Sequence, residues 1–138
     1  MRLLPAILLL ACAVPPAPNG WQVSSQGTQG NQSVVDCAVA AVRAVAPGLP
    51  ADGWVLVLPN RYVTADYCHA VVYGCAYDDP YPSVVVWVDG VEVPTLAASA
   101  LGHELCHHAT YVPGLTVQEY QDRADACAAA AQVPARCG

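Results

Sequence analysis

The most informative absence in this chain is that of lysine. Its five cationic side chains are all arginines that lie singly along the sequence, and the formal net charge is −6. Without lysine, every mechanism that uses a lysine nucleophile or Schiff base is excluded. Without a cluster of positive charge, we expect no binding to nucleic acid and no attraction to a membrane surface through a basic patch.

No C-x-x-C pair occurs, which argues against a zinc ribbon and against a thioredoxin-like redox site. Beyond Cys12, an even set of six cysteines remains, which predicts three disulfides in an oxidising compartment. The alternative is buried free thiols in a reducing compartment. The sequence does not choose among the pairings, but the local choices are Cys68–Cys75 and Cys127–Cys137. These would leave Cys37 to pair with Cys106.

The apolar run near the N-terminus is too short to span a bilayer. It follows one arginine and precedes the small-residue site Ala11-Cys12-Ala13, so residues 1–13 are expected to form a signal peptide. The end of this run also resembles a bacterial lipobox, in which Cys12 would carry a lipid anchor. Soluble and lipid-tethered forms both remain open, and both are secreted or held in the cell envelope. The Ala, Val, Pro and Gly usage suggests a bacterial or phage genome.

The remaining chain is expected to form a monomeric α+β domain over residues 33–138, after a flexible leader over 14–32 that is rich in Pro, Gly, Ser and Gln. A helix is predicted over 34–46, capped by Ser33, with Val35, Val39, Val42 and Val45 on its apolar side. Strands are predicted over 54–58, once or twice within 62–77, and over 83–89. Asp89-Gly90 signals a hairpin with 91–93 as its return strand, so the small sheet is expected to be mostly antiparallel.

The densest chemical signal is His103-Glu104-Leu105-Cys106-His107. The preceding segment predicts a helix with Thr95 as its N-cap and an apolar stripe of Leu96, Ala100, Leu101 and Leu105. On a helix, residues four apart project from the same face about 6 Å apart, so both imidazoles can reach one metal ion and Glu104 can reach a water bound to it.

This HExxH pattern resembles the zincin metallopeptidases, over roughly residues 95–131. The resemblance implies a zinc ion (Zn²⁺) held by His103 and His107, a water activated by the metal, and Glu104 as the general base that hydrolyses a peptide or protein substrate. It also implies that the strand before the active helix, residues 83–89, forms the edge of the site and holds the substrate in an extended form. Those valines are equally well explained as core residues.

A catalytic zinc needs a third protein ligand, which we expect on a second helix over 117–131 that begins after Thr116. This helix loosely resembles the glutamate helix of gluzincins, in which a ligand Glu precedes by four residues an Asp that orients a metal-bound His. Asp125 fits the orienting role, but four residues before it lies Gln121, a poor zinc ligand. Asp122 is preferred as the ligand over Glu119, because Thr116 and Glu119 also form a capping-box pattern.

Four side chains are candidates for stabilising the oxyanion, with nothing in their spacing to select among them: Tyr111, Tyr120, His108 and Arg123. Two other classes of protein remain open. One is a non-catalytic zincin-like module that binds a partner or keeps zinc for stability. The other is a disulfide-stabilised envelope protein in which HExxH is accidental and the histidines are solvated or merely hydrogen-bonded.

Overall fold

Short valine-rich runs form the centre of a four-stranded sheet in the computed structural model, which describes residues 16–24, 32–59, 65–69, 72–87 and 93–138. The strands are β1 (Trp21–Val23), β2 (Gly53–Leu58), β3 (Gly74–Tyr77) and β4 (Ser83–Trp87), in the order β1-β2-β4-β3. β1 and β2 pair in parallel, as do β2 and β4, whereas β3 is antiparallel to β4. The α+β prediction is confirmed. The sheet is mixed, and the prediction that it is mostly antiparallel is wrong.

The parallel pairings follow from the connections between the strands. Helix α1 (Gln32–Val45) lies between β1 and β2 in the chain, and the short helix α2 (Ala65–Cys68) and β3 lie between β2 and β4. Parallel neighbours require such crossovers, whereas a tight hairpin always gives an antiparallel pair. β4 is buried along its whole length, as strands covered on both faces are. In the described parts of the 62–77 region, α2 comes first and β3 is the one strand.

The segment around Trp21 belongs to the folded domain. Trp21 is 4% exposed, and its Nε1 donates a hydrogen bond to the carbonyl oxygen of Pro50 at 2.8 Å. A Cβ at Gly53 would lie only 2.5 Å from the Trp21 ring, so glycine is required beneath it. The flexible leader predicted over 14–32 is therefore wrong for residues 16–24. A three-residue strand is too short to show an alternating pattern.

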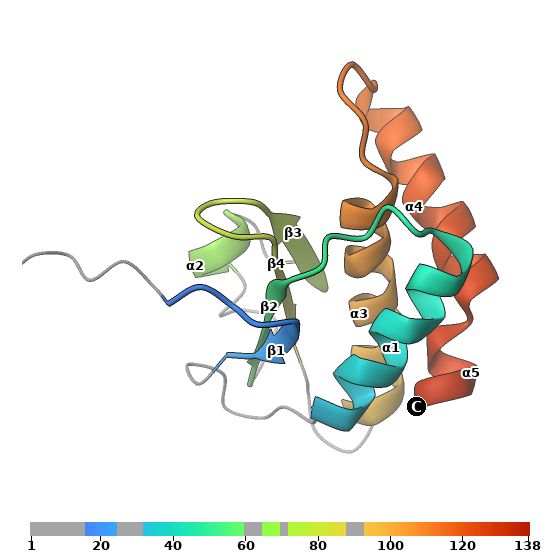
Figure 1. Cartoon of the computed structure of the whole chain (residues 1–138). Helices are drawn as coiled ribbons and strands as arrows, with labels where there is room; N and C mark the ends of the chain where they lie inside the picture. The colour runs from blue at the N-terminus through green and yellow to red at the C-terminus, as the bar shows by residue number, and fades with distance from the viewer. Residues whose placement is uncertain (1–15, 25–31, 60–64, 70–71, 88–92) are drawn as a thin grey trace, which may run out of the picture.

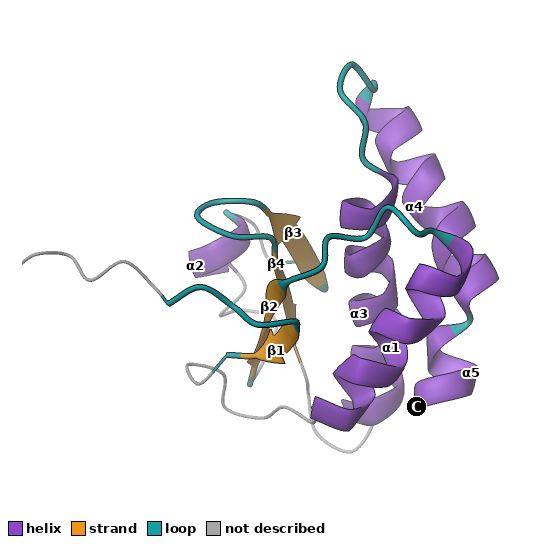
Figure 2. Ribbon diagram, in the orientation of Figure 1, coloured by secondary structure: helices purple, strands orange, loops and turns teal. Residues whose placement is uncertain are grey.

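All helices other than α2 pack in two layers on one face of the sheet (Figures 1 and 2). α1 and α3 (Val93–Thr110) contact the strands, and α4 (Val117–Ala131) and α5 (Val133–Cys137) pack against those two helices. Between sheet and helices lies the main core, which includes Val55, Val57, Val84, Val86, Val42, Leu101 and Leu105. Of the predicted apolar side of α1, Val35, Val39 and Val42 are buried, but Val45 is 40% exposed. No helix within the described ranges is long and apolar enough to cross a membrane.

The helix boundaries test the capping predictions. α4 begins after Thr116, whose hydroxyl accepts from the Glu119 backbone N–H while the Glu119 carboxylate accepts from the Thr116 N–H, so the predicted capping box is confirmed. α1 begins at Gln32, which places Ser33 inside the helix. α3 begins at Val93, so neither Thr95 as an N-cap nor a strand ending at Val93 is correct. The predicted signal peptide and the Asp89-Gly90 turn lie outside the described residues.

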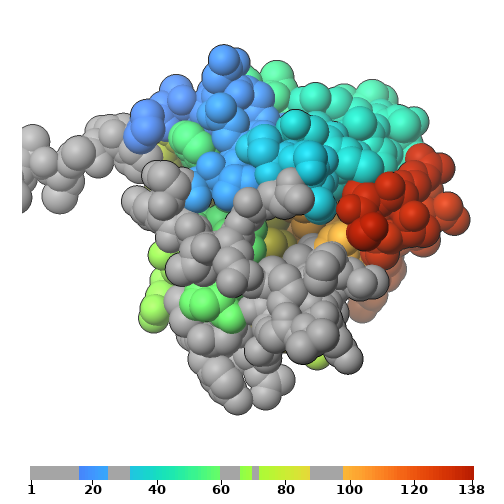
Figure 3. Space-filling view, turned by 90° about the horizontal axis from the view of Figure 1, so that it is seen from below, coloured from blue at the N-terminus to red at the C-terminus, as the bar shows by residue number. Residues whose placement is uncertain are grey.

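Three disulfides join segments that packing brings together. Cys68 pairs with Cys75, as predicted, but the other two pairs are Cys37–Cys137 and Cys106–Cys127. The predictions of Cys127–Cys137 and Cys37–Cys106 are wrong. α3 and α4 pack against each other and bring Cys106 beside Cys127, while α1 lies beside the C-terminal segment (Figure 3). The sequence alone does not show that either pair of cysteines lies close together in the fold.

Candidate active site

Helix α3 presents the three side chains of its HExxH motif to one cavity of about 560 Å³. His103, Glu104 and His107 line this cavity together with residues of β3 and of α4. The burial of Leu101 and Leu105 on the core side of α3 explains this orientation, because those residues turn the motif toward the gap between β3 and α4. The structure thus brings together the three residues that the motif singled out.

The two imidazoles lie at a separation that suits one metal ion. Their ring centroids are 4.7 Å apart and the rings are nearly perpendicular, at 89°. Two imidazoles that bind one tetrahedral zinc through bonds of about 2.0–2.1 Å have their ring centres about 5 Å apart. Asp125 Oδ1 lies 3.3 Å from His103 Nδ1, which is the contact predicted for an orienting carboxylate. The other ring nitrogen of His103 is left for a ligand role.

His107 is the more buried of the pair, with 4% of its surface exposed. Its Nδ1 is buried without a hydrogen-bond partner, and the ring stacks on Tyr120 at a centroid distance of 4.1 Å. Burial, and next the neighbouring His103, lower the pKa of His107 to about 4, against the opposing effects of Asp125 and of a hydrogen bond that the ring donates to the Gln121 side chain. The ring is therefore neutral near neutral pH, the form in which an imidazole binds a metal.

Glu104 is a buried carboxylate, with 7% of its surface exposed. Burial raises the pKa of Glu104 to about 7. Strand β3 passes directly beside it at Gly74, where a Cβ would lie 3.1 Å from Glu104 Cγ and 2.6 Å from the carbonyl oxygen of Val85. Glycine at this position therefore leaves room for the carboxylate between the strand and α3.

The two carboxylates predicted as third ligands lie away from this cavity. Glu119 is held in the capping box at the start of α4. Asp122 Oδ1 accepts a hydrogen bond from Gln118 Nε2 at 2.7 Å, on an exposed part of the same helix. Across the part of the chain that the structure describes, no three His, Cys, Asp or Glu side chains form a group that could hold a metal ion. The described residues thus bring two histidines and a glutamate to one cavity, and these do not form a three-ligand group.

From α4, the cavity is lined by Tyr120 and Gln121. Burial, and next the Glu104 carboxylate, raise the pKa of Tyr120, so its phenol remains a proton donor that faces the motif. Of the other oxyanion candidates, Tyr111 is 58% exposed and Arg123 is exposed. His108 Nε2 hydrogen-bonds the carbonyl oxygen of Ser83 at 2.8 Å, and its Nδ1 lies 3.3 Å from Asp78, which makes it a link between α3 and the start of β4.

The strand at the edge of the cavity is β3, with Gly74, Cys75 and Ala76 in the cavity wall. β4 lies between β2 and β3 in the sheet, so its backbone is paired on both sides. The prediction that residues 83–89 form the substrate edge is therefore wrong for β4. β3 takes the edge position because the chain turns back after α2 and pairs outside β4.

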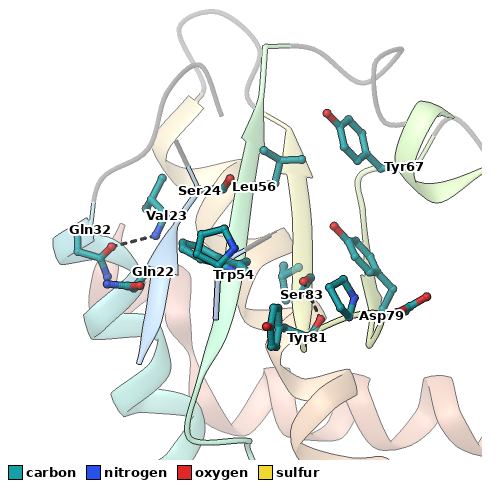
Figure 4. A pocket seen from close by; sticks show the side chains of 14 residues that line it. Gln22, Val23, Ser24, Gln32, Trp54, Leu56, Tyr67, Asp79, Tyr81 and Ser83 are labelled. Atoms are coloured by element: carbon teal, nitrogen blue, oxygen red, sulfur yellow. Dashed lines mark hydrogen bonds between the residues drawn. The ribbon is translucent and has the colours of Figure 1, made fainter. Parts of the chain in front are cut away.

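A second cavity, of about 430 Å³, is lined by residues of β1, β2, β3 and β4 and of α2 (Figure 4). Trp54, Tyr67, Tyr77 and Tyr81 make it aromatic, and Ser83 Oγ donates a hydrogen bond to the Tyr81 carbonyl oxygen at 2.8 Å. Its described lining contains no histidine and a single carboxylate, Asp79. The described lining of this second cavity therefore lacks a set of metal ligands and a pair of acid–base residues.

Fold and site together define a small α+β domain with a mixed sheet and an HExxH helix that faces a cavity beside the sheet edge. Comparison with protein-family models, with curated proteins and with solved structures finds no match for this chain. Its function therefore has to be argued from the chemistry of the site itself.

Proposed function

We propose that this protein is an exported zinc-dependent peptidase whose site is formed by His103, Glu104 and His107. The observation that carries the proposal is the convergence of two imidazoles and a buried carboxylate on one cavity. The rings have the spacing of co-ligands, and the buried, unpartnered Nδ1 of His107 marks a polar environment that protein groups do not complete. His103 and His107 would hold the metal, which supplies an activated water and polarises the scissile carbonyl.

Glu104 is the proton carrier in this proposal. Its carboxylate accepts a proton from the attacking water and returns it to the leaving amine, so that the peptide bond is replaced by a carboxylate and a free amine. The burial of Glu104 beside Gly74 excludes bulk water from one side and keeps the carboxylate close to the histidines. Asp125 orients His103 through Nδ1.

Strand β3 is the surface on which we expect the substrate to bind. It is an edge strand, paired only with β4 in the described sheet, and it lines the same cavity as the motif. An extended peptide can add to such an edge through main-chain hydrogen bonds. This arrangement favours segments of unfolded or flexible protein as substrates.

The three disulfides support an extracytoplasmic location, either secreted or in the cell envelope. A monomer and a lipid on Cys12 remain predictions from the sequence. One observation favours the alternative of a non-catalytic module that binds a partner. Among the described residues, no third His, Cys, Asp or Glu joins the two histidines.

Metal analysis of the purified full chain tests the proposal. After incubation with the metal, we expect about one zinc per chain, which a strong chelator removes, and His103→Ala and His107→Ala should each lose the metal because each removes one of the imidazoles that hold it. His69→Asn is the matched control: His69 has a φ of 58°, which asparagine tolerates, and it lies outside the cavity lining. A wild-type protein that holds no zinc, even after addition of the metal, would remove the basis for a zinc peptidase.

Tyr120→Phe should lower kcat by about 10²-fold with a smaller change in KM, because the phenol is expected to stabilise charge that develops on the scissile carbonyl. Tyr111→Phe is the matched control, since Tyr111 contacts the edge of the Tyr120 ring but is exposed and lies outside the cavity lining. Hydrolysis of a labelled unfolded protein measures both variants. Equal rates for wild type and Tyr120→Phe would assign the ring a packing role against His107.

A further inference from the structure

We propose that Gln121 is the third protein donor of the site, so that the metal is held by two imidazoles and an amide oxygen, all uncharged, and is bound weakly and reversibly. This inference rests on the zinc site of the proposed function. It concerns a residue that the motif does not contain and that the sequence alone disfavours as a ligand.

The first step is the register between α3 and α4. Asp125 contacts His103, and Gln121 hydrogen-bonds His107. His103 and His107 are four residues apart on α3, and Gln121 and Asp125 are four residues apart on α4. The two helices therefore run antiparallel here, with two successive turns of one against two successive turns of the other. The Cys106–Cys127 disulfide joins the same two helices next to these contacts. The register therefore places the Gln121 amide beside His107 in the cavity.

The second step is the composition of the cavity wall. α4 contributes Tyr120 and Gln121 to the described lining. Tyr120 lies nearly parallel to His107, with an angle of 22° between the rings, so that it covers the imidazole face. Glu119 and Asp122 are engaged in hydrogen bonds at the start of α4, and Asp125 already contacts His103. Gln121 remains in the described lining, and its amide oxygen accepts a hydrogen bond from the His107 ring, so this oxygen already lies beside a proposed ligand.

The third step is charge. Structural and catalytic zinc sites are usually completed by His, Cys or a carboxylate, whereas amide oxygens are weaker donors toward zinc. Three neutral donors leave the full charge of the ion uncompensated by its ligands, so affinity is lower than with a glutamate in the same place. Replacing Gln121 by glutamate adds one negative charge at nearly unchanged shape.

Zinc titration of the metal-free full chain, in competition with a chromophoric chelator, tests this inference. We expect Gln121→Glu to tighten zinc binding at least about tenfold, since even outer partners of a ligand change metal affinity by about 10–100-fold. Gln121→Ala should weaken binding, while the control Asp122→Asn should leave it unchanged. Far-ultraviolet circular dichroism of the metal-free variants verifies that all remain folded.

Weakened binding in Asp122→Asn together with unchanged binding in both Gln121 variants would overturn the inference and return the third-ligand role to Asp122. Zinc binding by Gln121→Glu in the absence of binding by the wild type would support the position of Gln121 but refute the proposed zinc peptidase. Failure of every variant, including Gln121→Glu, to bind zinc would overturn both.

Discussion

Glu104→Gln should lower the rate of peptide hydrolysis by about 10²–10⁴-fold, the usual contribution of a positioned general base, while zinc content and fold stay unchanged. Glutamine has nearly the same shape as glutamate, so it fits the space that Gly74 leaves beside β3. It cannot accept the proton of the attacking water. Because the substitution removes a buried carboxylate, we expect no loss of stability. Hydrolysis of a labelled unfolded protein, zinc analysis and thermal unfolding measure the three properties.

The chain offers a matched control at the start of α4. Glu119→Gln makes the same chemical change, and glutamine also completes a capping box, so activity and stability should stay near those of the wild type. Undiminished hydrolysis by Glu104→Gln would show that the motif does not act as a general-base site. If hydrolysis is lost together with zinc, Glu104 acts in metal binding instead.

Removal of the Cys37–Cys137 disulfide should lower the free energy of unfolding by about 4–5 kcal/mol, the largest stability effect that we expect from a single covalent change. This bond joins α1 to α5 across a sequence separation of 100 residues, so it restricts the unfolded chain more than a short loop does. Without it, the helices that cover the sheet are tied to each other by packing and by Cys106–Cys127. Urea unfolding of Cys37→Ser/Cys137→Ser measures the loss.

Cys68→Ser/Cys75→Ser is the comparison, because this disulfide spans a sequence separation of only 7. The same loop-entropy relation predicts a loss of about 2–3 kcal/mol. Both double variants remove one disulfide and add two hydroxyl groups, so the difference between them isolates the effect of loop length. A larger loss for the short loop would contradict the loop-entropy argument and indicate that local packing around α2 dominates.

The helices of this protein were predictable because their signals are local. Thr116 and Glu119 cap α4 through contacts three residues apart, and the valines of α1 repeat with the helical period. The spacing of His103 and His107 placed both on one face of α3 for the same reason. The resemblance to the glutamate helix of gluzincins indicated that Asp125 would lie beside an imidazole, and it does contact His103.

The sheet and the covalent links were not predictable in this way. Parallel pairing of β2 with β4 depends on where the chain crosses, and the burial of Trp21 depends on a partner strand about thirty residues later, at Gly53. An edge strand such as β3 and a central strand such as β4 both read as short apolar runs. The pairing of Cys37 with Cys137 depends on the same long-range packing.

By itself, the sequence determined the chemical inventory of the site: two histidines and a glutamate at helical spacing, in a cysteine-rich chain without lysine. Only the tertiary structure decided which other residues line the cavity, because α3 and α4 meet in a register that no local pattern encodes. That register brings Gln121 and Tyr120 to the histidines and leaves Asp122 and Glu119 out of the cavity lining. Contacts within one helix follow from residue spacing, whereas contacts between helices follow from how side chains pack.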